Sequence, residues 1–159
     1  MVELVIVIPL FLMLVMGMVT GGTVYNHKLD LVHAAREGAR YGAAIPQAQC
    51  NDTSKCGGKT WAGLVQSVVV QRSDGDVTTP QVCVALVSGS GGTVVGGSGG
   101  QTPFTTKDDH VSNCYDDGGG DTFTRVQVQI KRTGDSINAV FFTVPVTLTS
   151  TATARFEQQ

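Results

Sequence analysis

Four cysteines are the residues with the clearest chemistry in this chain of 159 residues. They are even in number and all follow an apolar N-terminal segment, at Cys50, Cys56, Cys83 and Cys114. This pattern is typical of an oxidising exterior and of two disulfides, although four cysteines allow three pairings. We favour Cys50–Cys56, which closes a small loop, and Cys83–Cys114, which closes a long glycine-rich loop. A zinc site is the alternative, but there is no C-x-x-C spacing and only His110 lies near Cys114.

Other polar residues point to chemistry more weakly. Asp116, Asp117 and Asp121 surround three glycines and form a weak candidate calcium site, because Ca²⁺ takes several oxygens from a flexible turn. The stretch Asp109–Ser112 holds the residue types of a catalytic triad, but the sequence has no G-x-S-x-G elbow. Gly58-Lys59-Thr60 lacks the first glycine of a phosphate-binding loop, because position 53 is threonine. We therefore expect no enzyme activity and no cofactor.

A glutamate stands directly before a long apolar run. No residue from Leu4 to Asn26 carries a formal charge. At about 1.5 Å of rise per residue, a helix over Leu4–Val24 spans a hydrocarbon core of ~30 Å. A secretory signal peptide is the alternative, but a basic segment should precede it and a small-x-small cleavage site should follow. A carboxylate at the edge of hydrocarbon is usually paired, so Glu3 is a candidate assembly residue; a glutamate lying among lipid headgroups is the plainer interpretation.

Small residues and a proline interrupt the apolar run. Pro9 removes one backbone donor and predicts a kink or loosening near the start of the helix. Gly17 and Gly21 form a G-x-x-x-G pair, which permits a second helix to approach closely. These three residues join Glu3 as candidate assembly residues.

The helical pattern continues well past the apolar run. Residues 23–44 contain no proline, and Pro46 ends the pattern. Small and apolar residues fall on one helical face of this second half, at Val24, Leu31, Ala35, Gly38 and Gly42. The two halves therefore predict one helix of over 40 residues, about 60 Å long.

The rest of the chain predicts a small sheet and one more helix. Thr60–Arg72 is expected to be a helix, capped near Thr60 or Lys59, with Trp61, Leu64, Val65 and Val68 on one side. A strand is the alternative, because the run Val68–Val70 is β-branched. Three strands are expected, at Gln81–Ser88, Thr122–Arg132 and Val144–Phe156, the last with Pro145 near its start as on an edge strand. In the second of them, Val126, Val128 and Ile130 share one face, and Arg125, Gln127, Gln129 and Lys131 share the other. The glycine-rich stretches Ser88–Gln101 and Asp116–Asp121 predict flexible loops.

Together these elements predict an α+β fold, in which the long helix packs on a small antiparallel sheet of three to four strands. We divide the chain into an apolar helix half (1–24), an amphipathic continuation (25–45) and a β-rich head that carries the disulfides (46–159). The formal net charge of −2 and the aromatic content of 6% argue against a nucleic-acid partner, because phosphate binding needs clustered Lys and Arg.

Both ends of the sequence resemble a known family. Val2–Glu3, the Ile8–Pro9 step in the apolar run and the block Ala34–Tyr41 (AAREGARY) resemble the N-terminal signature of TadE/TadG-like pilins, from the tight-adherence (Flp) branch of type IV pili. Leu148–Glu157 resembles the closing strand of that family. The resemblance implies a prepilin whose short leader is removed at the cytoplasmic face of the membrane. The glutamate of such chains usually stands at the fifth mature position and here is third in the sequence, so the exact mature start stays open.

The resemblance implies a structural subunit of a bacterial filament. The chain would be anchored in the cytoplasmic membrane, processed by a prepilin peptidase and polymerised by pilus assembly machinery into a homo-oligomeric, extracellular helical filament for surface attachment. Glu3 would then pair with the N-terminal amine of a neighbouring subunit. Two alternatives stay open: a minor pseudopilin that initiates or tips a fibre of another protein, and a monomeric, membrane-anchored exterior binding domain.

Overall fold

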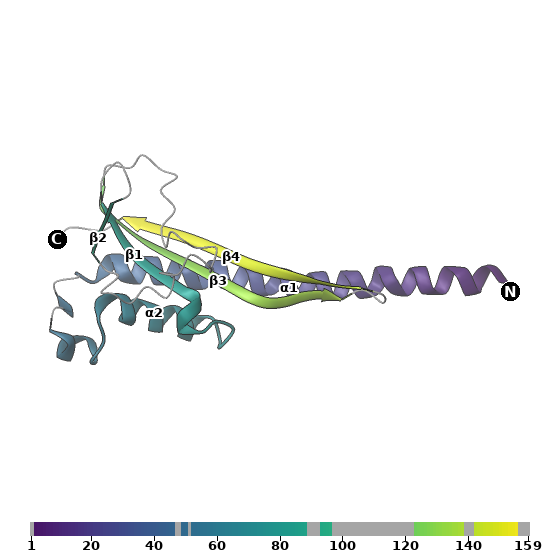
Figure 1. Ribbon diagram of the computed structural model, residues 1–159, viewed down its shortest axis with the longest axis horizontal. Helices are drawn as coiled ribbons and strands as arrows, with labels where there is room; N and C mark the ends of the chain where they lie inside the picture. The colour runs from purple at the N-terminus through teal and green to yellow at the C-terminus, as the bar shows by residue number, and fades with distance from the viewer. Residues whose placement is uncertain are drawn as a thin grey trace.

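One helix runs the length of the molecule, and an antiparallel sheet lies along its second half (Figure 1). The computed structural model describes residues 2–46, 49–50, 52–88, 93–96, 123–138 and 142–155. The first helix, α1 (Val2–Ala44), has 43 residues and continues through Pro9. It ends before Pro46, as the pattern predicts. The expected single long helix is therefore confirmed.

The sheet has four strands, all paired antiparallel in the order β2-β1-β3-β4. Their bounds are Val82–Ser88 (β1), Thr93–Gly96 (β2), Arg125–Asn138 (β3) and Thr143–Arg155 (β4). The α+β fold is thus confirmed, and Pro145 lies on an edge strand, where its missing N–H costs no ladder bond. The prediction of a flexible loop over Ser88–Gln101 is wrong at β2, because this short β-branched run pairs with β1 despite the glycines around it.

The strand β3 is longer than its sequence pattern predicts. The prediction ended the strand at Arg132, because Thr133 and Gly134 resemble a turn. The structure instead places a register shift between Arg132 and Asp135, after which β3 pairs with β4 as far as Asn138. Gly134 has φ of +110°, a conformation that a glycine adopts without steric cost. The apparent turn is therefore a β-bulge inside a continuous hairpin.

A second helix, α2 (Trp61–Arg72), packs beside α1 on the same face of the sheet. Thr60 caps it, since the Thr60 hydroxyl accepts a hydrogen bond from the amide of Gly63 at 3.2 Å. Its buried residues are Trp61, Ala62, Val65, Gln66 and Val69, whereas Leu64 and Val68 are only partly buried. The predicted face is thus rotated, because α2 contacts both α1 and β1. Gln66 is buried because its side-chain amide donates to the carbonyl of Val82 at 2.8 Å.

The core lies between the two helices and the sheet. Its fully buried members include Leu31 and Ala35 from α1, Val65 and Val69 from α2, and the β3 face formed by Val126, Val128 and Ile130. The opposite face of β3 carries polar residues, as the alternation predicts, yet Arg125 and Gln127 are also buried. Short 3-10 helices at Thr53–Cys56 and Thr79–Gln81 flank α2 in the chain.

Candidate assembly site

The N-terminal half of α1 projects beyond the sheet and carries the largest exposed apolar surface of the described residues (Figure 1). Its large side chains are 38–69% exposed; they are Leu4, Ile6, Val7, Ile8, Leu10, Phe11, Leu12, Leu14, Val15, Met16, Met18 and Val19. Among the described residues, the core and the side chains packed against it begin only at Val24. The helix is long and apolar enough to cross a membrane. A surface of this kind needs lipid or another protein to cover it.

The chain contains two G-x-x-x-G pairs on α1, and the structure places them in opposite environments. A Cβ atom built on Gly17 or Gly21 would meet nothing within 4 Å. A Cβ on Gly42 would lie 3.0 Å from Val126 Cγ1 and 3.1 Å from Val65 Cγ2, and one on Gly38 would overlap with Val69 Cγ2. The space beside the second pair is therefore occupied by α2 and the sheet of the same chain, whereas the first pair leaves an open surface of small residues.

The other candidate assembly residues lie on the same projecting segment. Glu3 is in the first turn of α1, and Pro9 is an exposed residue inside the helix. Of the described residues, only Thr20 of this half has a side chain within hydrogen-bonding distance of the sheet: its hydroxyl lies 3.4 Å from the carbonyl oxygen of Asn138 and 2.9 Å from that of Met16 in its own helix. Glu3, Pro9, Gly17 and Gly21 thus lie on one helical segment, where Pro9 is exposed and Gly17 and Gly21 face open space.

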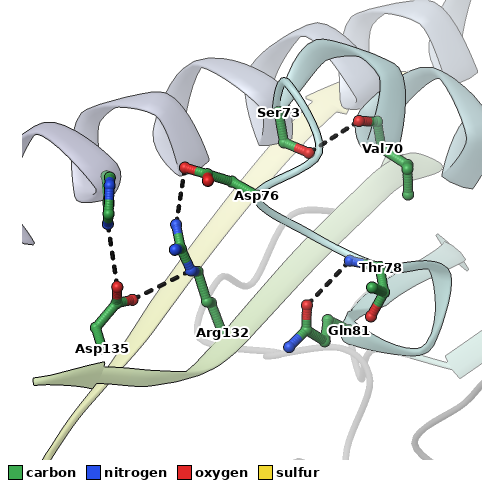
Figure 2. A network of polar contacts seen from close by, with 8 residues as sticks. Val70, Ser73, Asp76, Thr78, Gln81, Arg132 and Asp135 are labelled. Carbon is green, nitrogen blue, oxygen red and sulfur yellow. Dashed lines mark hydrogen bonds and ion pairs between the residues drawn. The ribbon is translucent and has the colours of Figure 1, made fainter.

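A polar cluster fastens the start of the second half of α1 to the sheet. His27 Nδ1 lies 3.0 Å from Asp135 Oδ1. Asp135 Oδ2 lies 3.2 Å from Arg132 Nε, and Arg132 Nη1 lies 2.8 Å from Asp76 Oδ2 in the turn after α2 (Figure 2). The side chain of Asp135 is 7% exposed and that of Arg132 is 16% exposed. Buried charges of this kind need paired partners, and the cluster supplies them from three separate parts of the chain.

The bulge in β3 explains why these charges face the helix. Arg132 pairs with Leu148 and Asp135 pairs with Val146, so β3 has one residue more than β4 between these points. The extra residue changes the alternation, and Asp135 therefore points to the same side as Arg132. The sequence analysis did not predict this cluster. The available signal was the place of Arg132, which falls on the same alternating face as Ile130 and Val128.

The described part of the head contains the expected small disulfide loop. Cys50 and Cys56 are bonded, with their Cα atoms 5.5 Å apart. Inside this loop, Asp52 accepts hydrogen bonds from the hydroxyl of Ser54 at 2.6 Å and from its amide at 3.2 Å, which together hold the pKa of Asp52 below its ordinary value. Cys83 is fully buried on β1. Its proposed partner Cys114 lies outside the described residues, so the Cys83–Cys114 pairing stays a prediction.

The structure gives little support for chemistry elsewhere. The weak calcium candidate at Asp116, Asp117 and Asp121 and the stretch Asp109–Ser112 both lie outside the described residues. Within the described ranges, no group of three or more His, Cys, Asp or Glu side chains is placed to hold a metal ion. A pocket of about 350 Å³ lies where α1 ends beside the end of β4, lined by Arg40, Ala43, Ala44, Ala154 and Arg155.

A long helix with an uncovered apolar first half, whose second half packs on a small antiparallel sheet, defines a pilin-like protein. Residues 1–40 match the family of TadE-like proteins. The matched segment includes Glu3, Pro9, Gly17 and Gly21, and the resemblance found at the N-terminus of the sequence is thereby confirmed. No curated protein and no solved structure matches the chain.

Proposed function

We propose that this chain is a structural pilin subunit, which polymerises through the first half of α1 into an extracellular Tad-type pilus for surface attachment. The observation that carries this proposal is the uncovered apolar segment at Leu4–Val19, which continues without a break into the half of α1 that packs on the sheet. A subunit of this shape can bundle its projecting segments in a filament core while the heads face outward.

Packing between helices is the physical basis of the proposed polymerisation. Lipid tails are as apolar as these side chains, so moving the segment from lipid into a filament gains little from the hydrophobic effect alone. The gain must come from close helix contacts, and the open surface at Gly17 and Gly21 permits them. In water, by contrast, each large side chain left uncovered would forfeit about 1.5–3 kcal/mol. The segment is therefore suited to lipid or to a helix bundle, and unsuited to solvent.

Glu3 has a specific part in this proposal. Its carboxylate pairs with the N-terminal amine of a neighbouring subunit, which neutralises both charges in the apolar core and sets the axial position of one subunit on the next. Breaking one side of such a pair leaves a buried charge and costs about 3–5 kcal/mol. Pro9, Gly17 and Gly21 complete the proposed assembly residues on the same segment.

The proposal assigns a role to each part of the chain. Residues 1–24 cross the cytoplasmic membrane before assembly and form the filament core afterwards. Residues 25–45 seat the head, and residues 46–159 form an outer, disulfide-bearing surface. A prepilin peptidase and the pilus assembly machinery are the partners that such a life cycle requires.

Negative-stain electron microscopy of sheared cell-surface material, with N-terminal sequencing of its dominant band, tests this proposal. We expect filaments in which this chain is the principal component. Filaments that contain it only in trace amounts would assign it instead to the minor pseudopilins. An empty sheared fraction, with detergent-solubilised protein that never associates, would favour a monomeric membrane-anchored domain.

A further inference from the structure

The far end of the β3–β4 hairpin carries exposed apolar side chains that the fold does not explain. We define the hairpin tip by its described residues Asn138, Phe142, Thr143 and Val144. Phe142 is 61% exposed and Val144 is 46% exposed. Among the described residues after Ile45, the other exposed large hydrophobic side chain is Phe123, and the guanidinium of Arg155 covers its ring at 4.9 Å. The hairpin tip is thus an apolar surface of the described head with no partner of its own.

The hairpin tip lies beside the membrane-spanning part of α1. Figure 1 shows β3 and β4 running along α1 toward its N-terminus, past the level of α2 and β1. The Thr20 hydroxyl oxygen lies 3.4 Å from the carbonyl oxygen of Asn138, and Asn138 is paired with Thr143 across the hairpin. These contacts set the hairpin tip level with Thr20.

The rise of the helix then gives the depth of the hairpin tip. If the hydrocarbon core extends from Leu4 to Val24, Thr20 lies four residues inside its outer edge, or about 6 Å. Amphipathic surface elements are buried about 5–10 Å into the boundary between headgroups and acyl chains. The hairpin tip therefore reaches this boundary while the head as a whole stays outside. Tyr25 is 63% exposed just beyond the spanning segment and provides an aromatic side chain at the same interface.

We propose that the hairpin tip is a second membrane contact, in which Phe142 and Val144 insert into the outer interfacial layer of the bilayer before assembly. This inference rests on the proposed membrane residence of the subunit. Lipid is the occupant because the hairpin tip lies beside the apolar half of α1, at the depth where apolar side chains meet acyl chains. With two contacts, the spanning helix and the hairpin, the head is held in one orientation to the membrane plane.

Quenching of tryptophan fluorescence by brominated lipids tests this inference. The variant Phe142→Trp of the full chain is reconstituted in vesicles of phosphatidylethanolamine and phosphatidylglycerol, brominated either near the headgroups or near the chain ends. The native Trp61 is a built-in reference, because it is 3% exposed and packs beside Gly42, about 27 Å along α1 from Val24. We expect headgroup-proximal bromines to reduce the emission of Phe142→Trp more than chain-end bromines do.

Two further variants make the result decisive. Thr153→Trp places the probe on the exposed side of the same strand, about 36 Å from position 142 by strand rise, and should show no loss of emission. Val15→Trp places it on the spanning segment and should be quenched by chain-end bromines. If Val15→Trp is quenched but Phe142→Trp behaves like Thr153→Trp, the membrane residence stands and the inference is overturned. If Val15→Trp is not quenched either, both fail. A Phe142→Trp emission that changes only in assembled filaments would overturn the lipid contact in favour of a contact between copies.

Discussion

At the residue scale, the same small side chain serves two purposes on one helix. Gly38 and Gly42 allow α2 and the sheet to approach α1 so closely that a methyl group would overlap with Val69 or press on Val126. Gly17 and Gly21 have the same spacing but face open space. Identical local patterns therefore have different consequences, because only one of them has its partner within the chain.

This contrast gives a prediction for Gly38→Ala. The added methyl group must displace Val69, a β-branched residue with little rotamer freedom in a helix, and we expect a loss of about 1–3 kcal/mol in the free energy of unfolding. The measurement is denaturant unfolding in detergent, followed by the fluorescence of Trp61. Gly21→Ala is the matched control and should not reduce the stability of the head. Equal stabilities for the two variants would contradict the packing described above.

A second residue-scale prediction concerns Glu3→Ala. Because Glu3 lies in the first turn of α1, far from the core, the variant should fold and remain in the membrane fraction. Loss of the proposed charge pair, worth about 3–5 kcal/mol when one buried partner is removed, should abolish filament assembly. Electron microscopy of sheared material and immunoblots of membrane fractions measure the two properties separately. A normal filament yield from Glu3→Ala would refute the pairing role. The control variant Glu3→Asp keeps the charge and should retain partial assembly.

At the element scale, polar contacts add to the hydrophobic packing between α1 and the hairpin. His27 contacts Asp135, and the ammonium group of Lys28 donates to the carbonyl of Thr149. Further along, Trp61 at the start of α2 donates from Nε1 to the carbonyl of Ile45 at 3.0 Å. The contacts of His27 and Lys28 join α1 to the hairpin and help to fix its position along the helix, whereas the Trp61 contact joins α2 to the end of α1.

The polar cluster around Asp135 and Arg132 makes Arg132→Ala a strong test of this attachment. The change leaves Asp135, whose side chain is 7% exposed, with His27 as its one described ion-pair partner, so we expect a loss of about 3 kcal/mol in the free energy of unfolding. Arg72→Ala is the control, because Arg72 and Glu37 are 3.7 Å apart and 63% and 51% exposed. A surface pair of this kind contributes about 0–1 kcal/mol. Comparable losses in the two variants would show that the cluster does not hold the hairpin.

At the scale of the whole molecule, the chain divides into a segment without a core and a head that has one. Among the described residues, the hydrophobic core and the side chains packed on it start at Val24. The second half of α1, α2 and the sheet supply its members. The apolar first half of α1 provides a surface that other molecules can cover, whereas the stability of the head arises from the hydrophobic core.

This division predicts that residues 24–159 fold without the projecting segment. The fragment should be monomeric in water, since it lacks the exposed apolar side chains of Leu4–Val19, and its unfolding midpoint should match that of the full chain in detergent. It should also fail to enter filaments. Size-exclusion chromatography and thermal unfolding followed by circular dichroism provide the measurements. A fragment that aggregates or melts well below the full chain would show that the first half stabilises the head.

Some features could be predicted from the sequence because they depend on neighbours within a few residues. The apolar run before Val19, the stop at Pro46 and the cap at Thr60 are local signals, and each element appears where those signals place it. The alternation of Val126, Val128 and Ile130 likewise identifies the face of β3 that packs on the helices, because the side-chain period of a strand is set by the backbone.

Other features depend on segments that meet only in the folded chain. The bulge at Gly134 turns Asp135 toward His27, 108 residues away in sequence, and no local pattern specifies that meeting. The buried face of α2 is decided by two neighbours at once, and the pairing of β2 with β1 overrides glycines that favour a loop. The sequence by itself therefore determined the long helix, its apolar half and the strands' inward faces, since these follow from backbone period and hydrophobicity. Only the tertiary structure decided which glycines have other side chains packed against them, which charges are buried and how far the hairpin reaches along α1. Those properties depend on the register between distant segments.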